Sequence, residues 1–292
     1  MWSAWIDKRI RYIFPAPALV FVIVMMAFPI AYTIRLSFTE WSMASRSAPE
    51  WIGLSNYVAL LTKDTRFWGA VGRTFCFTAV AVAIETVLGV AIALVLNREM
   101  PGKNLIKTLF LLPMVATPVA VGMVWLLMYE PTIGVANHVL RLLHIAPKYW
   151  LASPKQALPS LILVDIWQWT PMITLITLAG LAGLPREPYE AALVDGANVF
   201  QSIGAITLPL MQPTILAAMT LRAIDAFKTF DIIYTMTQGG PGYATETLNI
   251  YSFVLGFQYF QMGKASALLI IFFALVLGIA IVFNWLKRPF EA

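Results

Sequence analysis

Residues 185–209 read PREPYEAALVDGANVFQSIGAITLP and form a short polar segment between two long apolar runs. Two prolines close the apolar run before it, and proline is well accepted in the first turn of a following helix. Glu187 and Glu190 suit the positive end of such a helix. The sequence therefore predicts a short amphipathic helix over residues 189–194, after which Gly196 lets the chain turn because glycine carries no Cβ.

The composition of the whole chain is that of a membrane protein. Of its 292 residues 60% are hydrophobic and only 12% are charged, and the mean hydropathy is +0.76. Soluble globular proteins carry roughly a quarter charged residues and about half apolar ones. The net charge of +5 is spread thinly beside apolar runs, as expected for residues that anchor membrane topology. We therefore expect membrane lipid, and not nucleic acid, around this chain.

Six apolar stretches are long enough to cross a bilayer, because about 20 helical residues span a hydrocarbon core of roughly 30 Å. The first is longer than the core of a secretory signal peptide and contains three prolines, which favours a retained helix. We therefore expect an all-α polytopic membrane protein. Residues 1–292 would form one transmembrane domain with its core at about 70–288, and residues 185–206 would be a loop. The expected spans are about 13–34, 75–96, 105–128, 157–184, 207–227 and 265–286.

An even number of spans places both termini on one side of the membrane. On the side that holds the termini, basic clusters lie directly next to the span ends. The segments on the opposite side hold about as many Lys and Arg in total, but they are roughly twice as long. Basic density therefore favours cytoplasmic N and C termini. The basic residues on the expected inner side are Lys8, Arg9, Arg11, Arg98, Lys103, Lys107, Arg186, Lys287 and Arg288.

The sequence carries no recognisable catalytic, nucleotide or metal motif. A phosphate-binding loop needs Gly-x4-Gly-Lys-Ser/Thr, and neither Gly-Lys pair of the sequence fits it. Gly263–Lys264 has Gln258 in place of the first glycine and precedes Ala265, and Gly102–Lys103 has Asn97 in that place and precedes Asn104. His138 and His144 have no cysteine or carboxylate cluster nearby, so we interpret them as surface residues of an outer loop. We therefore expect this chain to be no enzyme, and to hold no metal and no cofactor of its own.

The spacing within the polar segment is Glu-Ala-Ala, three residues, Gly, nine residues, then Ile-x-Leu-Pro. This pattern resembles, at every position, the EAA loop of the membrane subunits of bacterial ABC importers. Residues 231–241 and 263–267 are similar to segments of the maltose and glycerol-phosphate type sugar permeases, and the resemblance covers roughly residues 13–288. The motif residues are Glu190, Ala191, Ala192, Gly196, Ile206, Leu208 and Pro209.

The resemblance implies a type I permease bundle in the bacterial cytoplasmic (inner) membrane, with residues 185–206 as its coupling loop. Glu190 would contact an ATPase subunit, Ala191 and Ala192 would permit close approach, and Gly196 would allow the bend. Implied partners are a second homologous permease, two ATP-binding cassette ATPases that hold ATP and magnesium, an extracytoplasmic solute-binding protein, and a sugar or sugar derivative as substrate. The implied coupling residues are Glu190, Ala191, Ala192, Asp195, Gly196, Leu208 and Pro209.

Other interpretations remain open. The polar segment could be an ordinary cytoplasmic loop with a surface helix. The chain could also be a secondary transporter driven by an ion gradient, which would act without an ATPase and carry an inverted repeat. No internal repeat is visible in the sequence. A membrane-embedded enzyme is disfavoured by the lack of a catalytic constellation.

Two of the expected spans carry polar residues at helical spacing i, i+3, i+4 and i+7, so each set shares one face. Both faces are expected in the outer half of the bilayer: Asp165 about 12 Å below the outer end of its span, and Arg222 about 22 Å above the inner end of its own. Charged residues at such depth are costly unless they face a cavity or a partner. The two sets are Asp165, Gln168, Trp169 and Met172, and Arg222, Asp225, Ala226 and Thr229.

Two interpretations of these faces stay open. The resemblance aligns them with the sugar-contacting faces of maltose-type permeases, which implies a hydrophilic cavity that binds a polar or anionic sugar derivative partly through Arg222. Alternatively they are buried ion pairs, for instance Arg222 with Asp225, that only fasten helices together. We interpret Glu85 as a hydrogen-bond partner between helices. We interpret four tryptophans as packing or interface anchors, namely Trp125, Trp150, Trp167 and Trp285.

Overall fold

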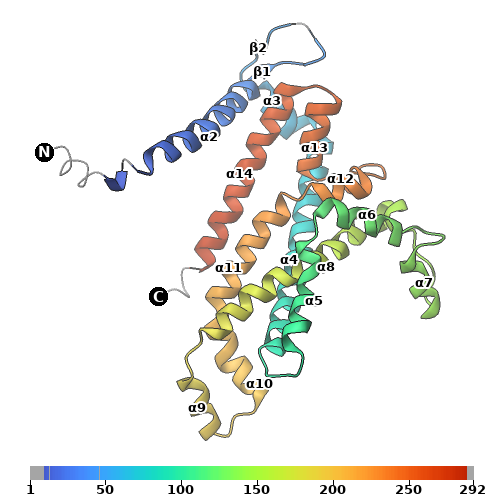
Figure 1. The fold of residues 1–292 in the computed structure, drawn as a ribbon. Helices are drawn as coiled ribbons and strands as arrows, with labels where there is room; N and C mark the ends of the chain where they lie inside the picture. The colour runs from blue at the N-terminus through green and yellow to red at the C-terminus, as the bar shows by residue number, and fades with distance from the viewer. Residues whose placement is uncertain (1–9, 13, 46, 288–292) are drawn as a thin grey trace, which may run out of the picture. The chain divides into compact units, whose positions relative to one another are not determined.

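The computed structural model describes residues 10–12, 14–45 and 47–287. This part of the chain is built almost entirely of helices, and five helical stretches in it are long and apolar enough to cross a membrane. The helical fold class is thus confirmed. The long helices are α2 (Ala16–Ser37), α4 (Thr65–Leu96), α8 (Pro154–Ala182), the run of α10 (Val199–Ser202), η3 (Ile203–Thr207) and α11 (Leu208–Phe227), and α14 (Met262–Lys287) (Figure 1).

Short elements connect the long helices. A two-stranded antiparallel sheet pairs β1 (Thr39–Glu40) with β2 (Glu50–Trp51). The short helical elements are α3 (Ser55–Val58), η1 (Ala59–Lys63), α5 (Lys103–Val115), α6 (Pro118–Met128), α7 (Val135–Leu142), η2 (Trp150–Ala152), α9 (Glu187–Val194), α12 (Asp231–Thr237), α13 (Leu248–Phe253) and η4 (Val254–Gln258).

The described residues group into two compact units, one within residues 1–64 and 252–272, the other within residues 65–251 and 273–292. The sequence predicts one transmembrane domain over residues 1–292, and that stays a prediction. Residue 13 and three of the basic residues used to predict orientation, Lys8, Arg9 and Arg288, lie outside the described residues.

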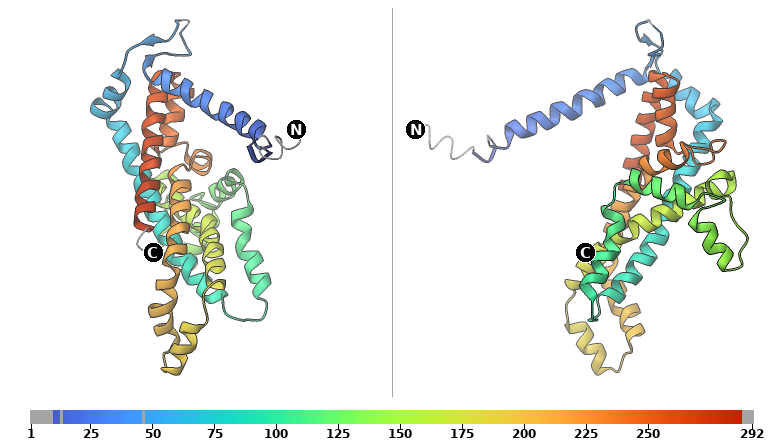
Figure 2. Two further views of the ribbon diagram at one scale, coloured as in Figure 1. Left: turned by 90° about the vertical axis from the view of Figure 1, so that its left-hand side faces the viewer. Right: turned by 45° about the vertical axis from the view of Figure 1, so that its right-hand side comes forward.

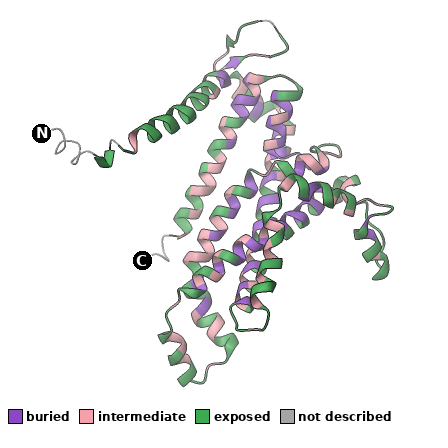
Figure 3. Ribbon diagram, in the orientation of Figure 1, coloured by how far each residue is buried: buried purple, intermediate pink, exposed green. Residues whose placement is uncertain are grey.

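The second unit is organised around α4, α8 and α11, which pack on one another along their lengths (Figure 2). Buried residues recur along all three helices (Figure 3). Small residues bring the helices close together: a Cβ on Gly89 of α4 would lie 2.8 Å from the side chain of Ile173 on α8. Close backbone approach of this kind is how membrane helices gain packing contacts, since lipid supplies no hydrophobic drive for their association.

The stretch predicted as a continuous third span is broken. Helices α5 and α6 meet at an angle of 95°. Thr117, at the break, has an extended backbone with φ −65° and ψ 138°, and Pro118 begins the next helix. The residue before a proline is disfavoured in the helical region because the proline ring clashes with it. Pro118 therefore explains the break, and whether α5 and α6 together make one crossing stays a prediction.

Several other helices begin earlier than the sequence predicts. Helix α4 starts at Thr65, ten residues before the predicted start at 75, and it includes Arg66 and Arg73. The helix tolerates both arginines because each bonds to Glu246, as described below. The fifth long helix begins at Val199, not at 207, because α10 and η3 continue into α11 without interruption.

The first unit contains α2, the small sheet and the region around the start of α14. The side-chain amide of Asn56 donates hydrogen bonds to the carbonyl oxygens of Ser37 and Thr39, at 3.0 and 2.9 Å. Lys264 forms an ion pair with Asp64 at 2.7 Å. These contacts join the segment after α2 to its neighbours inside the same unit. Along α2, only Leu36 and Ser37 at its end are buried.

Candidate functional site

The polar segment folds as a helix, a turn and a second helix. Helix α9 begins at Glu187, with Glu187 and Glu190 in its first turn, so the predicted surface helix is present and starts two residues earlier than expected. Gly196 follows with φ +75°, in the left-handed region that favours glycine. The predicted turn at this position is therefore confirmed.

A capping box begins the second helix. The side-chain oxygen of Asn198 accepts a hydrogen bond from the backbone N–H of Gln201 at 2.9 Å, and the side chain of Gln201 accepts one from the N–H of Asn198 at 2.7 Å. Reciprocal bonds of this kind fix the first turn of a helix. The interpretation of the sequence missed this pair, although Asn-x-x-Gln before an apolar run is a recognisable signal.

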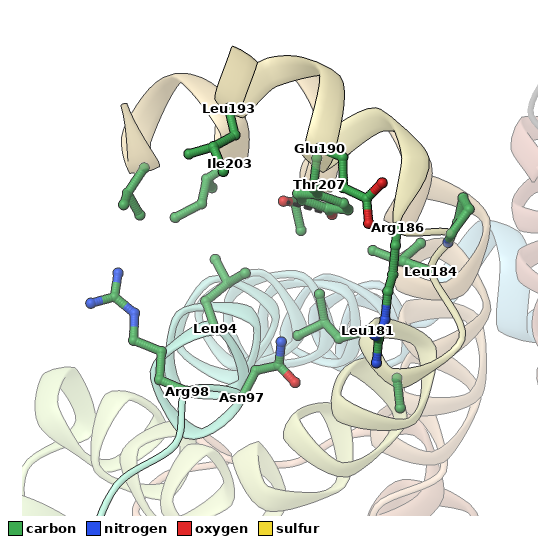
Figure 4. A pocket seen from close by; sticks show the side chains of 14 residues that line it. Leu94, Asn97, Arg98, Leu181, Leu184, Arg186, Glu190, Leu193, Ile203 and Thr207 are labelled. Carbon is green, nitrogen blue, oxygen red and sulfur yellow. Dashed lines mark hydrogen bonds between the residues drawn. The ribbon is translucent and has the colours of Figure 1, made fainter. Parts of the chain in front are cut away.

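A cavity of about 600 Å³ separates α9 from the ends of the long helices. Figure 4 shows Glu190 and Leu193 on one side of it, with Leu94, Asn97 and Arg98 of the α4 end facing them. One side-chain hydrogen bond crosses between the two arms of the loop: Tyr189 Oη lies 3.0 Å from Thr207 Oγ1. Helix α9 is thus tied at one side to η3, within the fifth long helix, and a cavity separates it from the bundle elsewhere.

The tip of the loop exposes large apolar side chains. Leu193 is 78% exposed, Val194 87% and Phe200 85%. Glu190 and Ala191 are exposed beside them. Exposed apolar side chains gathered at one place, rimmed by polar residues, mark a site of contact with another protein, a membrane or a ligand. The remaining coupling residues that the resemblance implies lie on the same segment: Ala192, Asp195 and Gly196 on the loop, and Leu208 and Pro209 in the first turn of α11.

The polar faces of the fourth and fifth spans meet in a buried ion cluster. Arg222 of α11 is 1% exposed, and its Nε lies 2.7 Å from Glu85 Oε2 on α4. A second nitrogen, Nη2, lies 3.2 Å from Glu85 Oε1 and also forms an ion pair with Asp165 on α8. The Trp169 ring stacks over the guanidinium, 5.3 Å from ring centre to Cζ. Three helices are therefore joined by one arginine.

Asp225 does not take part in this cluster, so the suggested Arg222–Asp225 pair is wrong. The Asp225 carboxylate is half exposed and lies 3.5 Å from Lys228 Nζ. It sits one turn nearer than Arg222 to the end of α11 at Phe227. The pairing of Glu85 with a neighbouring helix confirms its predicted role as an interhelical partner.

The other residues of the two polar faces are mostly packed inside the unit. Gln168 is fully buried and donates to the carbonyl oxygen of Ala116 at the α5–α6 break, at 3.3 Å. Ala226 is buried, and Met172 and Thr229 are half-buried. Two buried oxygens, Asp165 Oδ1 and Gln168 Oε1, have no hydrogen-bond partner among the described residues. The geometry favours a role in fastening helices, and contact of these residues with a substrate stays a prediction.

A second ion cluster, which the interpretation of the sequence missed, lies where α4 begins. Arg66 makes a two-point contact with Glu246, Nε to Oε2 at 2.7 Å and Nη2 to Oε1 at 2.5 Å. Arg66 also stacks over the rings of Tyr243 and Tyr251, and Arg73 donates to the Glu246 carbonyl oxygen at 2.7 Å. These contacts hold the segment that follows the Gly239–Gly242 turn.

Comparison with known proteins gives the family. The family described as "Binding-protein-dependent transport system inner membrane component" matches residues 85–291. This chain belongs to that family. The resemblance to ABC importer permeases is therefore confirmed, and so is the polytopic helical membrane fold.

The relatives cover almost the whole chain. The probable ABC transporter permease protein y4oQ of Sinorhizobium fredii is 40% identical over 93% of this chain and 88% of its own length. The trehalose/maltose transport system permease protein MalF of Thermococcus litoralis is 36% identical over 95% of this chain and 93% of its own length. Among solved structures, a chain of a bacterial alginate ABC transporter in complex with its periplasmic protein superimposes with a TM-score of 0.84, at 22% identity, over 99% of this chain and 97% of that one.

Proposed function

We propose that this chain is the permease subunit of an ATP-driven ABC importer that carries a sugar or sugar derivative across the cytoplasmic membrane. The observation that carries the proposal is the coupling loop, a capped helix–turn–helix whose tip exposes Leu193, Val194 and Phe200 beside Glu190. The family and the trehalose/maltose permease among the relatives support the transport role and the sugar class.

Energy would enter through α9 and reach the membrane helices by three connections. Two are covalent, through residues 183–186 to the end of α8 and through residues 195–198 to the start of α10. The third is the Tyr189–Thr207 hydrogen bond to η3, next to the start of α11. Because Arg222 joins α11 to α4 and α8, a push on either end would move these three helices together. The loop would then switch access to the pathway by moving a braced group of helices.

The hydrolysis itself belongs to partners in this proposal. The sequence has no phosphate-binding loop, so ATP and magnesium would be held by two ATPase subunits docked on the exposed loop tip. A second homologous permease would complete the pathway, and a solute-binding protein outside the membrane would deliver the substrate. The coupling loop would then face the cytoplasm, with both termini on the same side.

Co-purification and uptake test the proposal together. The wild-type chain should co-purify with an ATPase subunit, and Val194→Asp and Glu190→Lys should release that subunit and abolish uptake while the protein still reaches the membrane. Ile133→Asp is a matched control, because Ile133 is 86% exposed at the opposite end of the long helices. It should leave co-purification unchanged.

The rival secondary transporter makes the opposite prediction. Uptake by this chain alone, sensitive to a protonophore and insensitive to ATP depletion, would overturn the importer proposal. So would the absence of any ATPase subunit together with full uptake by Glu190→Lys. The sugar can be identified by binding assays on the solute-binding protein encoded beside this chain.

A further inference from the structure

The loop between α6 and α8 is held in one conformation by a single buried amide. Asn137, on α7, is fully buried. Its amide group donates to the carbonyl oxygens of Pro131 and Lys148, both at 2.9 Å, and its oxygen accepts from the Lys148 N–H at 2.9 Å and from Trp150 Nε1 at 2.8 Å. An amide offers two donors and one oxygen, and all are used here. The loop is therefore ordered around α7, at the opposite end of α8 from the coupling loop.

Beneath α7 lies a slot of about 240 Å³ between this loop and the start of α8. Its walls are mainly apolar, and two lysines stand among them. Two uncharged polar groups of the wall are already bonded: Gln156 Oε1 accepts from the N–H groups of Tyr149 and Trp150, and the Ser160 hydroxyl donates to the Gln156 carbonyl. The lining residues are Leu140, Lys148, Trp150, Lys155, Gln156, Pro159, Ser160 and Leu163.

Positive side chains outnumber negative ones in this loop, whose one carboxylate, Glu130, accepts from the N–H groups of Thr132 and Ile133. Residues 131–164 contain no Asp or Glu, whereas they contain Arg141, Lys148 and Lys155. Within the described part of the chain, neither lysine ammonium group at the slot forms an ion pair. Lys155 also lies in the first turn of the 29-residue helix α8, where the helix dipole favours an anion.

Aromatic side chains place the slot at the level of a membrane interface. Tyr129 stacks on Trp150 at 4.7 Å between ring centres, and Trp125 contacts both Tyr129 at 5.2 Å and Trp167 at 5.5 Å. Trp and Tyr gather at the head-group level of bilayers because their rings are amphipathic. Burial raises the pKa of Tyr129 to about 12, so its hydroxyl stays neutral and donates to the Ser160 carbonyl oxygen.

The slot opens onto an apolar surface. Leu163 is 51% exposed on α8, a helix apolar enough to span the membrane. The outward face of α7 carries Val135, Val139 and Leu142, each between 46% and 66% exposed. An amphipathic helix with such a face and basic neighbours lies in the interface of a bilayer. Lipid is therefore the occupant that this surface fits.

We propose that the slot binds one anionic phospholipid. Its acyl chain would lie along Leu140, Pro159 and Leu163, and its phosphate would lie by the ammonium groups of Lys148 and Lys155. A lipid with a neutral head group would bind more weakly, because the attraction of anionic lipid to basic residues at the membrane surface supplies part of the affinity. The slot opens to the lipid-facing surface of the protein, and lipid binding there does not depend on which substrate is transported.

Retention of lipid by the purified full-length chain tests the proposal. The protein is freed of co-purified lipid in mild detergent and titrated with phosphatidylglycerol, with phosphatidylcholine, or with glycerol phosphate as a head group without acyl chains, and bound lipid is counted by native mass spectrometry. Phosphatidylglycerol should bind tightly in one copy, phosphatidylcholine weakly and glycerol phosphate not at all. Lys148→Gln and Lys155→Gln should each lower the affinity for phosphatidylglycerol about five-fold, since a basic residue near the membrane surface contributes about 1 kcal/mol to binding.

Matched variants separate the slot from the general positive charge. Arg141→Gln removes the same charge from α7 but not from the slot, and should leave binding unchanged. Leu140→Trp fills the slot and should abolish binding, whereas Leu142→Trp, on the exposed face of the same helix, should not. Equal binding of the two lipids, or an equal loss in Arg141→Gln, would overturn the proposal. So would a second protein chain found covering Leu163 in the assembled complex with no lipid retained.

Discussion

Arg222 and Glu85 lie 137 residues apart in the sequence and meet through two contacts, Nε to Oε2 at 2.7 Å and Nη2 to Oε1 at 3.2 Å, with both side chains buried. With Asp165 the cluster holds two carboxylates and one guanidinium inside a group of helices. Removing one partner of a buried ion pair leaves an uncompensated charge, which is more damaging than removing both. This asymmetry determines what substitutions here should do.

Arg222→Met should destabilise the protein by about 3–5 kcal/mol, because Glu85 and Asp165 would then be buried without a cation. Thermal unfolding in detergent measures this. Adding Glu85→Gln and Asp165→Asn to Arg222→Met should recover most of the loss, and Lys228→Gln, which removes a half-exposed pair with Asp225, should change little. If the triple variant stays as unstable as the single one, the uncompensated charges of Glu85 and Asp165 are not the cause of the lost stability. If Arg222→Gln leaves uptake unchanged in an assembled complex, Arg222 does not bind the substrate.

Gly89→Ala should destabilise the packing of α4 on α8. Alanine is normally better than glycine inside a helix by about 1 kcal/mol. Here the added Cβ would lie 2.8 Å from Ile173 Cγ2, and such overpacking costs typically about 1–3 kcal/mol. Gly278→Ala is the matched control, since a Cβ there meets nothing within 4 Å, and it should be neutral or stabilising. Equal effects of the two substitutions on the unfolding temperature would contradict the close approach.

The local features of the sequence predicted most of what is local in the structure. The lengths of the apolar stretches predicted the long helices. The prolines, acidic residues and glycine around Glu190 predicted α9 and the turn at Gly196. Glu85, Asp165 and Arg222 were recognisable as polar residues at membrane depth, and the depth estimate placed Asp165 and Arg222 at similar levels, where they indeed meet.

Which charged groups pair could not be predicted, because pairing depends on how helices distant in sequence pack. Asp225 was the near neighbour of Arg222 along the chain, yet Glu85 is its partner. The early start of α4 could not be predicted for the same reason. A charged residue such as Arg66 is unfavourable in a membrane helix unless it is paired, and its partner, Glu246, lies 180 residues later in the sequence. The break between α5 and α6 could have been predicted from Pro118, but the prediction of the third span rested on hydropathy, which is high on both sides of the break.

The capping box at the start of α10 should act as one unit. Asn198→Ala should destabilise the start of α10 by about 1 kcal/mol, since it leaves a backbone N–H without its acceptor. Gln201→Ala should have a smaller effect, and the double variant should cost less than the two single losses added together, because the residues share two reciprocal bonds. Hydrogen exchange of residues 198–202 measures this. Strictly additive losses would show that the two bonds form independently.

Arg66→Gln should loosen the segment from Gly239 to Tyr251. The carboxylate of Glu246 is 2% exposed and would lose its two-point partner, at a cost of about 3–5 kcal/mol if the site stays closed to water. Arg66→Lys should recover only part of this, because an ammonium group cannot reproduce the two parallel bonds or the stacking on Tyr243 and Tyr251. Limited proteolysis and hydrogen exchange across residues 239–251 report the change. Lys103→Gln serves as the control, since its pair with Glu99, a residue 95% exposed, contributes little to stability. Protection of residues 239–251 that stays at the wild-type level in Arg66→Gln would mean that the two tyrosines and Arg73 suffice to hold the segment.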